Sequence, residues 1–140
     1  MTKPINIVTG VIGEDVHITG IRILEHALRK SSFNVESLGI HNSDDDFINA
    51  ARETDAAAIL ISSLAGHARL LVGDLRDKCN EAGMADVVLY LGGQLVVEEQ
   101  AWPDTERLFI DMGFNWVCPP YVTPGIIIEK LTQDLKGTGS

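Results

Sequence analysis

Asp15 and His17 stand two residues apart directly after an apolar run, Ile5–Ile12, and Gly20 follows three residues later. One ring nitrogen of a histidine can coordinate a metal ion, and a carboxylate that holds the other nitrogen's proton fixes the tautomer. The spacing therefore predicts a metal ligand with a carboxylate partner at the end of a strand. Taken alone, the same two residues also fit a helix cap and a first-turn surface residue.

Two further groups of small or polar residues follow later apolar runs. Ser62, Ser63 and Leu64 come after the third run, and Gly92 and Gly93 come after the fourth. Serine hydroxyls supply hydrogen bonds, and glycines let a ligand approach the backbone closely. A hydrogen-bonded strand end and a tight turn are the alternative interpretations. Both groups become informative only if the fold brings them to the place where His17 lies.

Short apolar runs alternate with helix-like stretches along the chain. The predicted strands are Ile5–Ile12, Asn34–Leu38, Ala58–Ser62, Val87–Leu91 and Trp116–Cys118. The predicted helices cover about 19–30, a segment capped by Ser43, about 70–82, about 103–113 and about 123–135.

This alternation predicts an α/β fold of one domain, with a doubly wound, five-stranded parallel sheet that is flavodoxin-like, or Rossmann-like. The expected strand order is 2-1-3-4-5, with the domain at residues 1–136 and a flexible tail at 137–140. In such sheets ligands bind beyond the carboxyl ends of the strands. The residues after strands one, three, four and five should therefore share one site.

The composition narrows the class of partner. The chain has 140 residues, 45% of them apolar, and a formal net charge of -9. An acidic balance argues against nucleic acid and anionic membranes as partners, because both attract basic surfaces. No apolar stretch reaches membrane length and no signal-like segment opens the chain, so we expect a cytoplasmic protein. The two cysteines, Cys79 and Cys118, are expected to be reduced thiols.

Together, the three motifs resemble the signature of cobalamin-binding domains. Asp15-x-His17-x-x-Gly20 resembles that family's D-x-H-x-x-G element, Ser62-x-Leu64 its S-x-L element, and Gly92-Gly93 its double glycine. Residues 21–61 and 65–91 separate them, and both gaps suit the family. Further segments from Gly10-Val11-Ile12-Gly13 to Pro119-Pro120 resemble the small subunit of glutamate mutase over almost the whole chain.

The resemblance implies a role for each matching residue. His17 is expected to be the lower cobalt ligand, with Asp15 as its hydrogen-bond partner. Gly20 is expected to let the first helix begin beside the cofactor's nucleotide tail. The complete set of expected cofactor-binding residues is Glu14, Asp15, Val16, His17, Ile18, Gly20, Ser62, Ser63, Leu64, Gly92, Gly93, Gln94, Leu95, Val96, Val97 and Pro120.

The function implied is that of the cobalamin-carrying subunit of an adenosylcobalamin-dependent mutase, most closely glutamate mutase. That enzyme interconverts L-glutamate and threo-3-methylaspartate by a radical rearrangement. No substrate-binding residues are evident in this chain, so a larger, barrel-type partner subunit is expected to bind the substrate. The chain alone is expected to be inactive.

Alternatives remain open at the level of sequence. Gly66-His67 resembles the cobalamin domains of acyl-CoA mutases, and Tyr121-Val122 stands where the glutamate mutase small subunit usually has Gly-Thr. A corrinoid methyl carrier or a cobalamin-dependent regulator is another alternative. A receiver domain fits less well, because Ser62-Ser63 and Cys118-Pro119 occupy the places of its aspartate and lysine. A flavodoxin fits less well because Glu14 and Asp15 would repel a phosphate.

Overall fold

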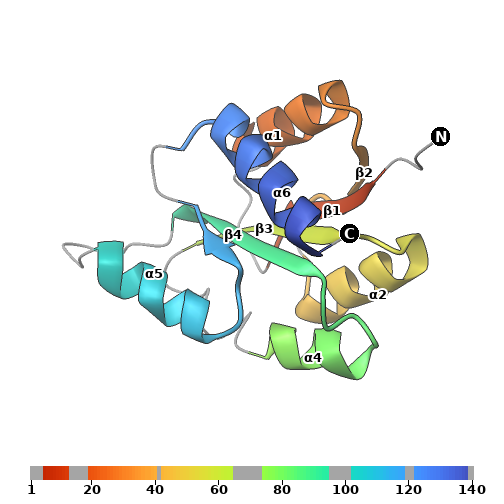
Figure 1. The fold of residues 1–140 in the computed structure, drawn as a ribbon, viewed down its shortest axis with the longest axis vertical. Coiled ribbons are helices and arrows are strands. Elements are labelled where there is room, and N and C mark those ends of the chain that lie inside the picture. Colours follow the sequence, from red (N-terminus) through yellow and green to blue (C-terminus); the bar gives the residue numbers. More distant parts are fainter. Residues whose placement is uncertain are drawn as a thin grey trace.

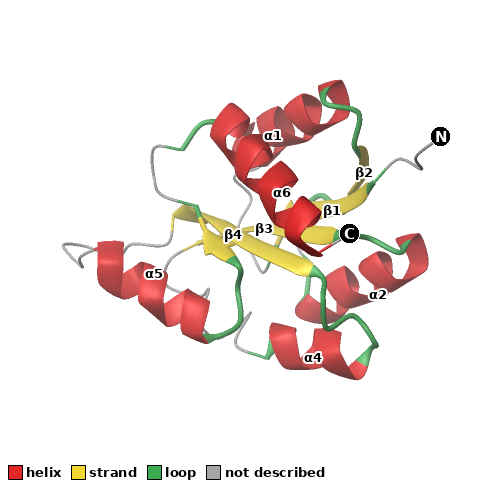
Figure 2. Ribbon diagram, in the orientation of Figure 1, coloured by secondary structure: helices red, strands yellow, loops and turns green. Residues whose placement is uncertain are grey.

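The computed structural model of the protein describes residues 5–12, 19–40, 42–64, 74–94, 102–118 and 122–138. Strands and helices alternate throughout these residues (Figures 1 and 2). In chain order they are β1 Asn6–Val11, α1 Thr19–Lys30, β2 Asn34–Ser37, α2 Asp44–Thr54, β3 Ala58–Leu64, α4 Leu75–Glu81, β4 Val88–Gln94, α5 Trp102–Asp111, β5 Trp116–Val117 and α6 Pro124–Thr138.

The strands form one parallel sheet in the order β2-β1-β3-β4-β5, as predicted. The chain moves outward from β1 to β2 and then returns to the other side of β1 at β3. The strand order therefore reverses between β1 and β3. In open α/β sheets the crevice beyond this point is the usual ligand site.

Helices cover both faces of the sheet (Figure 1). Between the sheet and helices α1 and α6, one apolar layer includes Ile7, Leu28, Leu60, Tyr90 and Leu131. Between the sheet and helices α2, α4 and α5, the other layer includes Val8, Phe47, Ile61, Leu89 and Phe109. Strands buried on both faces need apolar residues at consecutive positions, which explains why β1, β3 and β4 read as continuous apolar runs.

Local sequence signals set several helix ends. Ser43 caps α2: its Oγ accepts a hydrogen bond from the Asp46 backbone N–H at 3.2 Å, and the Asp46 carboxylate accepts one from the Ser43 N–H at 2.9 Å. This reciprocal pair is a capping box. The predicted cap at Ser43 is therefore confirmed. Helix α1 also has the predicted bounds, Thr19–Lys30.

Other boundaries differ from the predictions. The strands β3 and β4 continue to Leu64 and Gln94, beyond the predicted ends at Ser62 and Leu91. Their backbones pair along this extension whatever the side chains are, so small and polar residues do not end the ladder. Helix α4 begins at Leu75, and residues 70–73 of the predicted helix lie outside the described residues. Helix α6 runs to Thr138, into the segment predicted to be a tail.

Arg76 of α4 fixes the segments that follow α4 and α5. Its guanidinium donates to the Gly113 carbonyl at 2.9 Å, the Val87 carbonyl at 2.9 Å and the Asn115 side-chain oxygen at 2.8 Å. Gly113 has φ +107°, and a Cβ there would lie 2.5 Å from the Arg76 Cβ. Only glycine fits this position.

Within the described part of the chain, no helix is both long and apolar enough to span a bilayer.

Candidate functional site at the carboxyl edge of the sheet

The carboxyl ends of β1, β3 and β4 bring two of the three sequence motifs side by side. In the parallel ladder Ser62 pairs with Gly92, Ser63 with Gly93 and Leu64 with Gln94. On its other side, Ser62 pairs with Val11 of β1, and the Ile12 N–H donates to the Ser62 carbonyl at 3.0 Å. The S-x-L and double-glycine elements are therefore neighbouring strand ends, whereas the sequence suggested loops after the strands.

Alternation along the strands decides which side of the sheet each residue faces. Leu60 and Tyr90 pack in the layer under α1 and α6, while Ile61 and Leu91 pack in the opposite layer. Since successive residues of a strand face opposite sides, Ser62 and Gly92 face α1 and α6. Ser63 and Gly93 face the other helices, and Ser63 is fully buried. Of the two serines, only Ser62 has its side chain on the α1 and α6 side.

The packing of the described residues does not require a glycine at position 92. A Cβ built at this glycine would lie 3.5 Å from the Cys118 Cβ and 3.7 Å from its Sγ, which are ordinary contact distances. Its φ lies outside the left-handed region. By contrast, a Cβ at Gly10 would lie 3.1 Å from both Leu38 and the Phe47 ring. Gly10 is thus needed for packing, whereas Gly92 is not, which fits a role in contact with another molecule.

Helix α1 completes the described part of the site. Gly20 is its second residue, and because α1 follows β1, the helix begins at the carboxyl edge of the sheet. The helix lies over the same face of the sheet (Figure 1). The fold therefore brings Gly20, Ser62 and Gly92 to one side of the carboxyl edge. The backbones of Leu64, Gly93 and Gln94 lie at the ends of β3 and β4.

The remaining predicted site residues lie outside the described residues. They are Glu14, Asp15, Val16, His17 and Ile18 before α1, Leu95, Val96 and Val97 after β4, and Pro120 after β5. Each of these segments adjoins a described strand end: 13–18 follows β1, 95–101 follows β4 and 119–121 follows β5. Their roles stay predictions.

A buried polar pair that sequence reasoning missed lies under α1. The Thr9 hydroxyl of β1 donates a hydrogen bond of 2.5 Å to Oε2 of Glu25, and the two residues are 0% and 1% exposed. Glu25 lies on the apolar face of α1 with Ile21, Leu24 and Leu28. An acidic residue at an apolar position of an amphipathic helix is the signal that could have found this pair.

Two titratable groups pack in the same layer, and both are held in their neutral form. Cys118 lies against Gly92, and burial raises the pKa of its thiol from the usual 9.0 to about 12. Burial and a hydrogen bond to Asp134 raise the pKa of Tyr90 above its ordinary value. A protonated thiol at high pKa is a poor nucleophile and a poor metal ligand. Cys118 therefore contributes packing contacts beside Gly92 and not a reactive thiolate.

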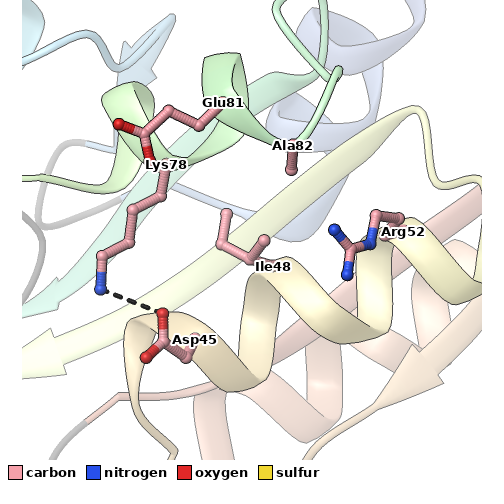
Figure 3. A pocket seen from close by; sticks show the side chains of 6 residues that line it. All are labelled: Asp45, Ile48, Arg52, Lys78, Glu81 and Ala82. Atoms are coloured by element: carbon pink, nitrogen blue, oxygen red, sulfur yellow. Dashed lines mark hydrogen bonds and ion pairs between the residues drawn. The ribbon is translucent and has the colours of Figure 1, made fainter.

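An open hollow between α2 and α4 is a separate feature (Figure 3). It is lined by Asp45, Ile48, Arg52, Lys78, Glu81 and Ala82. The Lys78 ammonium lies 3.0 Å from the carboxylates of both Asp44 and Asp45, which raise its pKa to about 12. The hollow lies between two helices and contains none of the predicted cofactor-binding residues. Its ion pairs join the start of α2 to α4.

Comparisons with known proteins agree with this geometry. The model of the family described as "B12 binding domain" matches residues 5–113. A cobalamin-binding protein from Desulfitobacterium hafniense has the same fold, with a TM-score of 0.77 at 18% identity. That match covers 94% of this chain and 60% of the other, so the chain spans about three fifths of that protein. The chain belongs to the B12-binding domain family.

Curated relatives identify the particular branch of this family. The glutamate mutase sigma subunit of Carboxydothermus hydrogenoformans is 48% identical over 95% of this chain and 97% of its own length. The glutamate mutase sigma subunit of Clostridium tetani is 47% identical over 92% of this chain and 94% of its own length. The chain is therefore a member of the glutamate mutase sigma subunits, the cobalamin-binding subunits of an isomerase.

Proposed function

We propose that this chain carries adenosylcobalamin at the carboxyl edge of its sheet and presents it to a larger subunit that interconverts L-glutamate and threo-3-methylaspartate. The observation that carries this proposal is the Ser62–Gly92 pair, which faces α1 beside the point where the strand order reverses. A glycine at position 92 that the packing of the described residues does not require supports the close approach of a ligand there. Membership in the glutamate mutase sigma subunits supports the choice of cofactor and reaction.

His17 is the proposed lower ligand of cobalt. Imidazole nitrogen is a suitable ligand for first-row transition metals, and a carboxylate that accepts the other ring N–H orients the imidazole and raises its basicity. Asp15 would be that carboxylate. The segment of both residues joins β1 to α1, and Gly20 lies at the start of that helix. A ligand from this segment would meet a group bound beside Ser62 and Gly92.

The remaining proposed contacts bind and orient the cofactor. Ser62 would donate a hydrogen bond to the nucleotide tail, and Gly92 would let the tail approach the backbone of β4. Leu64, Gly93 and Gln94 would border the same slot. The other proposed neighbours are Glu14, Val16, Ile18, Ser63, Leu95, Val96, Val97 and Pro120. When bound, the cofactor supplies radical chemistry through homolysis of its cobalt–carbon bond, and the protein supplies binding and position.

A larger subunit is the proposed partner. The name "sigma subunit" of the relatives supports an assembly with at least one other kind of chain. We propose that this partner is a barrel-type subunit that binds the amino acid and covers the upper face of the corrin. A cytoplasmic location is proposed for the complex. The acidic chain is not expected to bind nucleic acid or an anionic membrane.

Cobalamin titration followed by electron paramagnetic resonance tests the ligand. The purified chain should change the absorption spectrum of cobalamin, and its cob(II)alamin complex should show nitrogen coupling that responds to 15N-labelled histidine. His17→Gly should remove that coupling. Coupling that persists in His17→Gly would reject His17 as the ligand, and no spectral change with the native chain would reject cobalamin binding.

An assay with large subunits tests the reaction. The chain, adenosylcobalamin and a glutamate mutase large subunit should together convert L-glutamate to threo-3-methylaspartate. Omission of any one of the three should abolish turnover. An acyl-CoA substrate with an acyl-CoA mutase large subunit serves as the matched comparison. Turnover only in the second mixture would overturn the proposed substrate but not cobalamin binding.

A further inference from the structure

Glu25 is a buried carboxyl group in an apolar layer. It is 1% exposed and lies in α1 between the buried side chains of Leu24 and Leu28. Removing a carboxyl group from water is costly unless its oxygens find hydrogen-bond donors. A buried acid in a core is therefore expected to have a partner for each oxygen.

Only one of the two oxygens of Glu25 has such a partner among the described residues. Oε2 accepts the Thr9 hydroxyl at 2.5 Å, whereas Oε1 is buried and receives no hydrogen bond. The Arg22 guanidinium forms an ion pair with this oxygen, with Nη1 3.5 Å from Oε1 and a side chain that is 57% exposed. At 3.5 Å this ion pair is longer than an ordinary hydrogen bond, so Oε1 still has the capacity to accept one.

The buried pair of Thr9 and Glu25 lies on the same side of the sheet as the candidate site. Thr9 lies two residues before Val11, and Val11 pairs with Ser62. Two residues of strand span about 7 Å, so Thr9 lies about that far below the level of Ser62 and Gly92 along the strand direction, with Ser62 one strand and Gly92 two strands to the side. Thr9, Ser62 and Gly92 all face α1 and α6 by alternation along the strands. A molecule that entered between α1 and the sheet past Ser62 would approach Glu25.

We propose that Glu25 is a further cofactor-binding residue, whose buried Oε1 accepts a hydrogen bond from a hydroxyl or amide N–H of cobalamin's nucleotide tail. This inference rests on the proposed function, because it assumes that cobalamin binds beside Ser62 and Gly92. Ribose hydroxyls are the best matched donors, since carboxylates recognise ribose hydroxyls in other nucleotide sites. The phosphate of the tail is excluded as the partner of Oε1 because two anionic oxygens repel each other.

Comparison of cobalamin with cobinamide tests the contact, since cobinamide has the same corrin but lacks the nucleotide. The dissociation constants of both are measured for the native chain, Thr9→Val, Glu25→Gln and the double variant Thr9→Val with Glu25→Leu. Replacing both members of the buried pair by apolar groups leaves no buried polar group without a hydrogen-bond partner, so the double variant should fold. In Glu25→Gln the amide oxygen can accept from Thr9, which places an N–H₂ group where the tail needs an acceptor.

Glu25→Gln and the double variant should lose about ten- to a hundredfold of the preference for cobalamin over cobinamide, as expected for one hydrogen bond to a charged group. Thr9→Val should keep that preference within about threefold, because Oε1 remains. An unchanged preference in both Glu25 variants would overturn the contact. An equal loss in Thr9→Val would also overturn it, since packing would then be the cause. If the native chain bound neither corrinoid, the proposed function itself would fail.

Discussion

Ser62 of β3 lies directly opposite Gly92 of β4, and both positions face the helices α1 and α6 at the carboxyl edge of the sheet. The pairing combines a hydroxyl donor with a residue that has no side chain of its own. It also adjoins β1, whose following segment carries His17. One side of one strand pair thus joins two motifs that are far apart in the sequence, and the segment with the third motif follows the neighbouring strand β1 in the chain.

Gly92→Ala is expected to impair binding without impairing the fold. A Cβ at this position meets Cys118 only at ordinary distances, so the free energy of unfolding should be unchanged or rise by up to about 1 kcal/mol. If the nucleotide tail lies on this backbone, the added methyl group should weaken cobalamin binding about ten- to a hundredfold, as overpacking of about 1–3 kcal/mol would. Urea unfolding and spectral titration measure the two effects separately.

Gly10→Ala is the matched control for that substitution. Its Cβ would lie 3.1 Å from Leu38 and from the Phe47 ring, so the core must shift to accept it. We expect a loss of about 1–2 kcal/mol in the free energy of unfolding. A fully folded Gly92→Ala variant with native affinity for cobalamin would contradict the role proposed for Gly92.

The sequence predicts the fold better than it predicts the contacts between residues at the candidate site. Continuous apolar runs and the Ser43 cap are local signals, and the alternation of strands and helices predicts the strand order, so most elements could be predicted. The extension of β3 and β4 to Leu64 and Gln94 could not, because backbone pairing there does not depend on side-chain type. The Thr9–Glu25 pair joins residues 16 apart across two elements; the sequence signals a buried acid in α1, but only the packing of α1 on β1 identifies Thr9 as its partner.

Asp15→Asn is expected to weaken cobalamin binding about ten- to a hundredfold and to leave some binding intact. An asparagine can keep the position of the imidazole but cannot stabilise its N–H as a carboxylate does. The nitrogen coupling from His17 should therefore persist in the cob(II)alamin complex of this variant. Spectral titration gives the affinity, and loss of the coupling together with native affinity would contradict the assigned roles.

Arg76→Met is expected to destabilise the protein by about 2–4 kcal/mol. The substitution removes the donors to the Gly113 and Val87 carbonyls and to the Asn115 side chain. Arg76→Lys should recover little of the loss, because one ammonium group cannot reproduce the planar fork. Arg52→Met, at an exposed position of α2, is the control and should change the free energy of unfolding by less than about 0.5 kcal/mol. Urea unfolding measures all three variants.

Alkaline pH is expected to destabilise the fold through Cys118. Burial raises the pKa of its thiol from 9.0 to about 12, so above pH 9 the unfolded chain loses this proton while the folded chain keeps it. The folded state then binds more protons than the unfolded state, and the free energy of unfolding falls as the pH rises. From pH 8 to pH 10 this thiol alone should contribute a loss of about 1 kcal/mol. Cys79 and Tyr90, whose pKa values are also raised, add to the loss in the same direction.

Cys118→Ala isolates the contribution of this thiol. The variant loses some stability at every pH because it leaves a small cavity beside Gly92, but its decline from pH 8 to pH 10 should be about 1 kcal/mol smaller than that of the native chain. Urea unfolding at the two pH values gives the comparison, since only the difference between the slopes reports the thiol. Equal declines in the native chain and in Cys118→Ala would mean that Cys118 ionises as readily in the folded protein as in the unfolded chain. In that case water would reach the layer between β4, β5 and α6, and the place proposed for the nucleotide tail beside Gly92 would not be shielded from solvent.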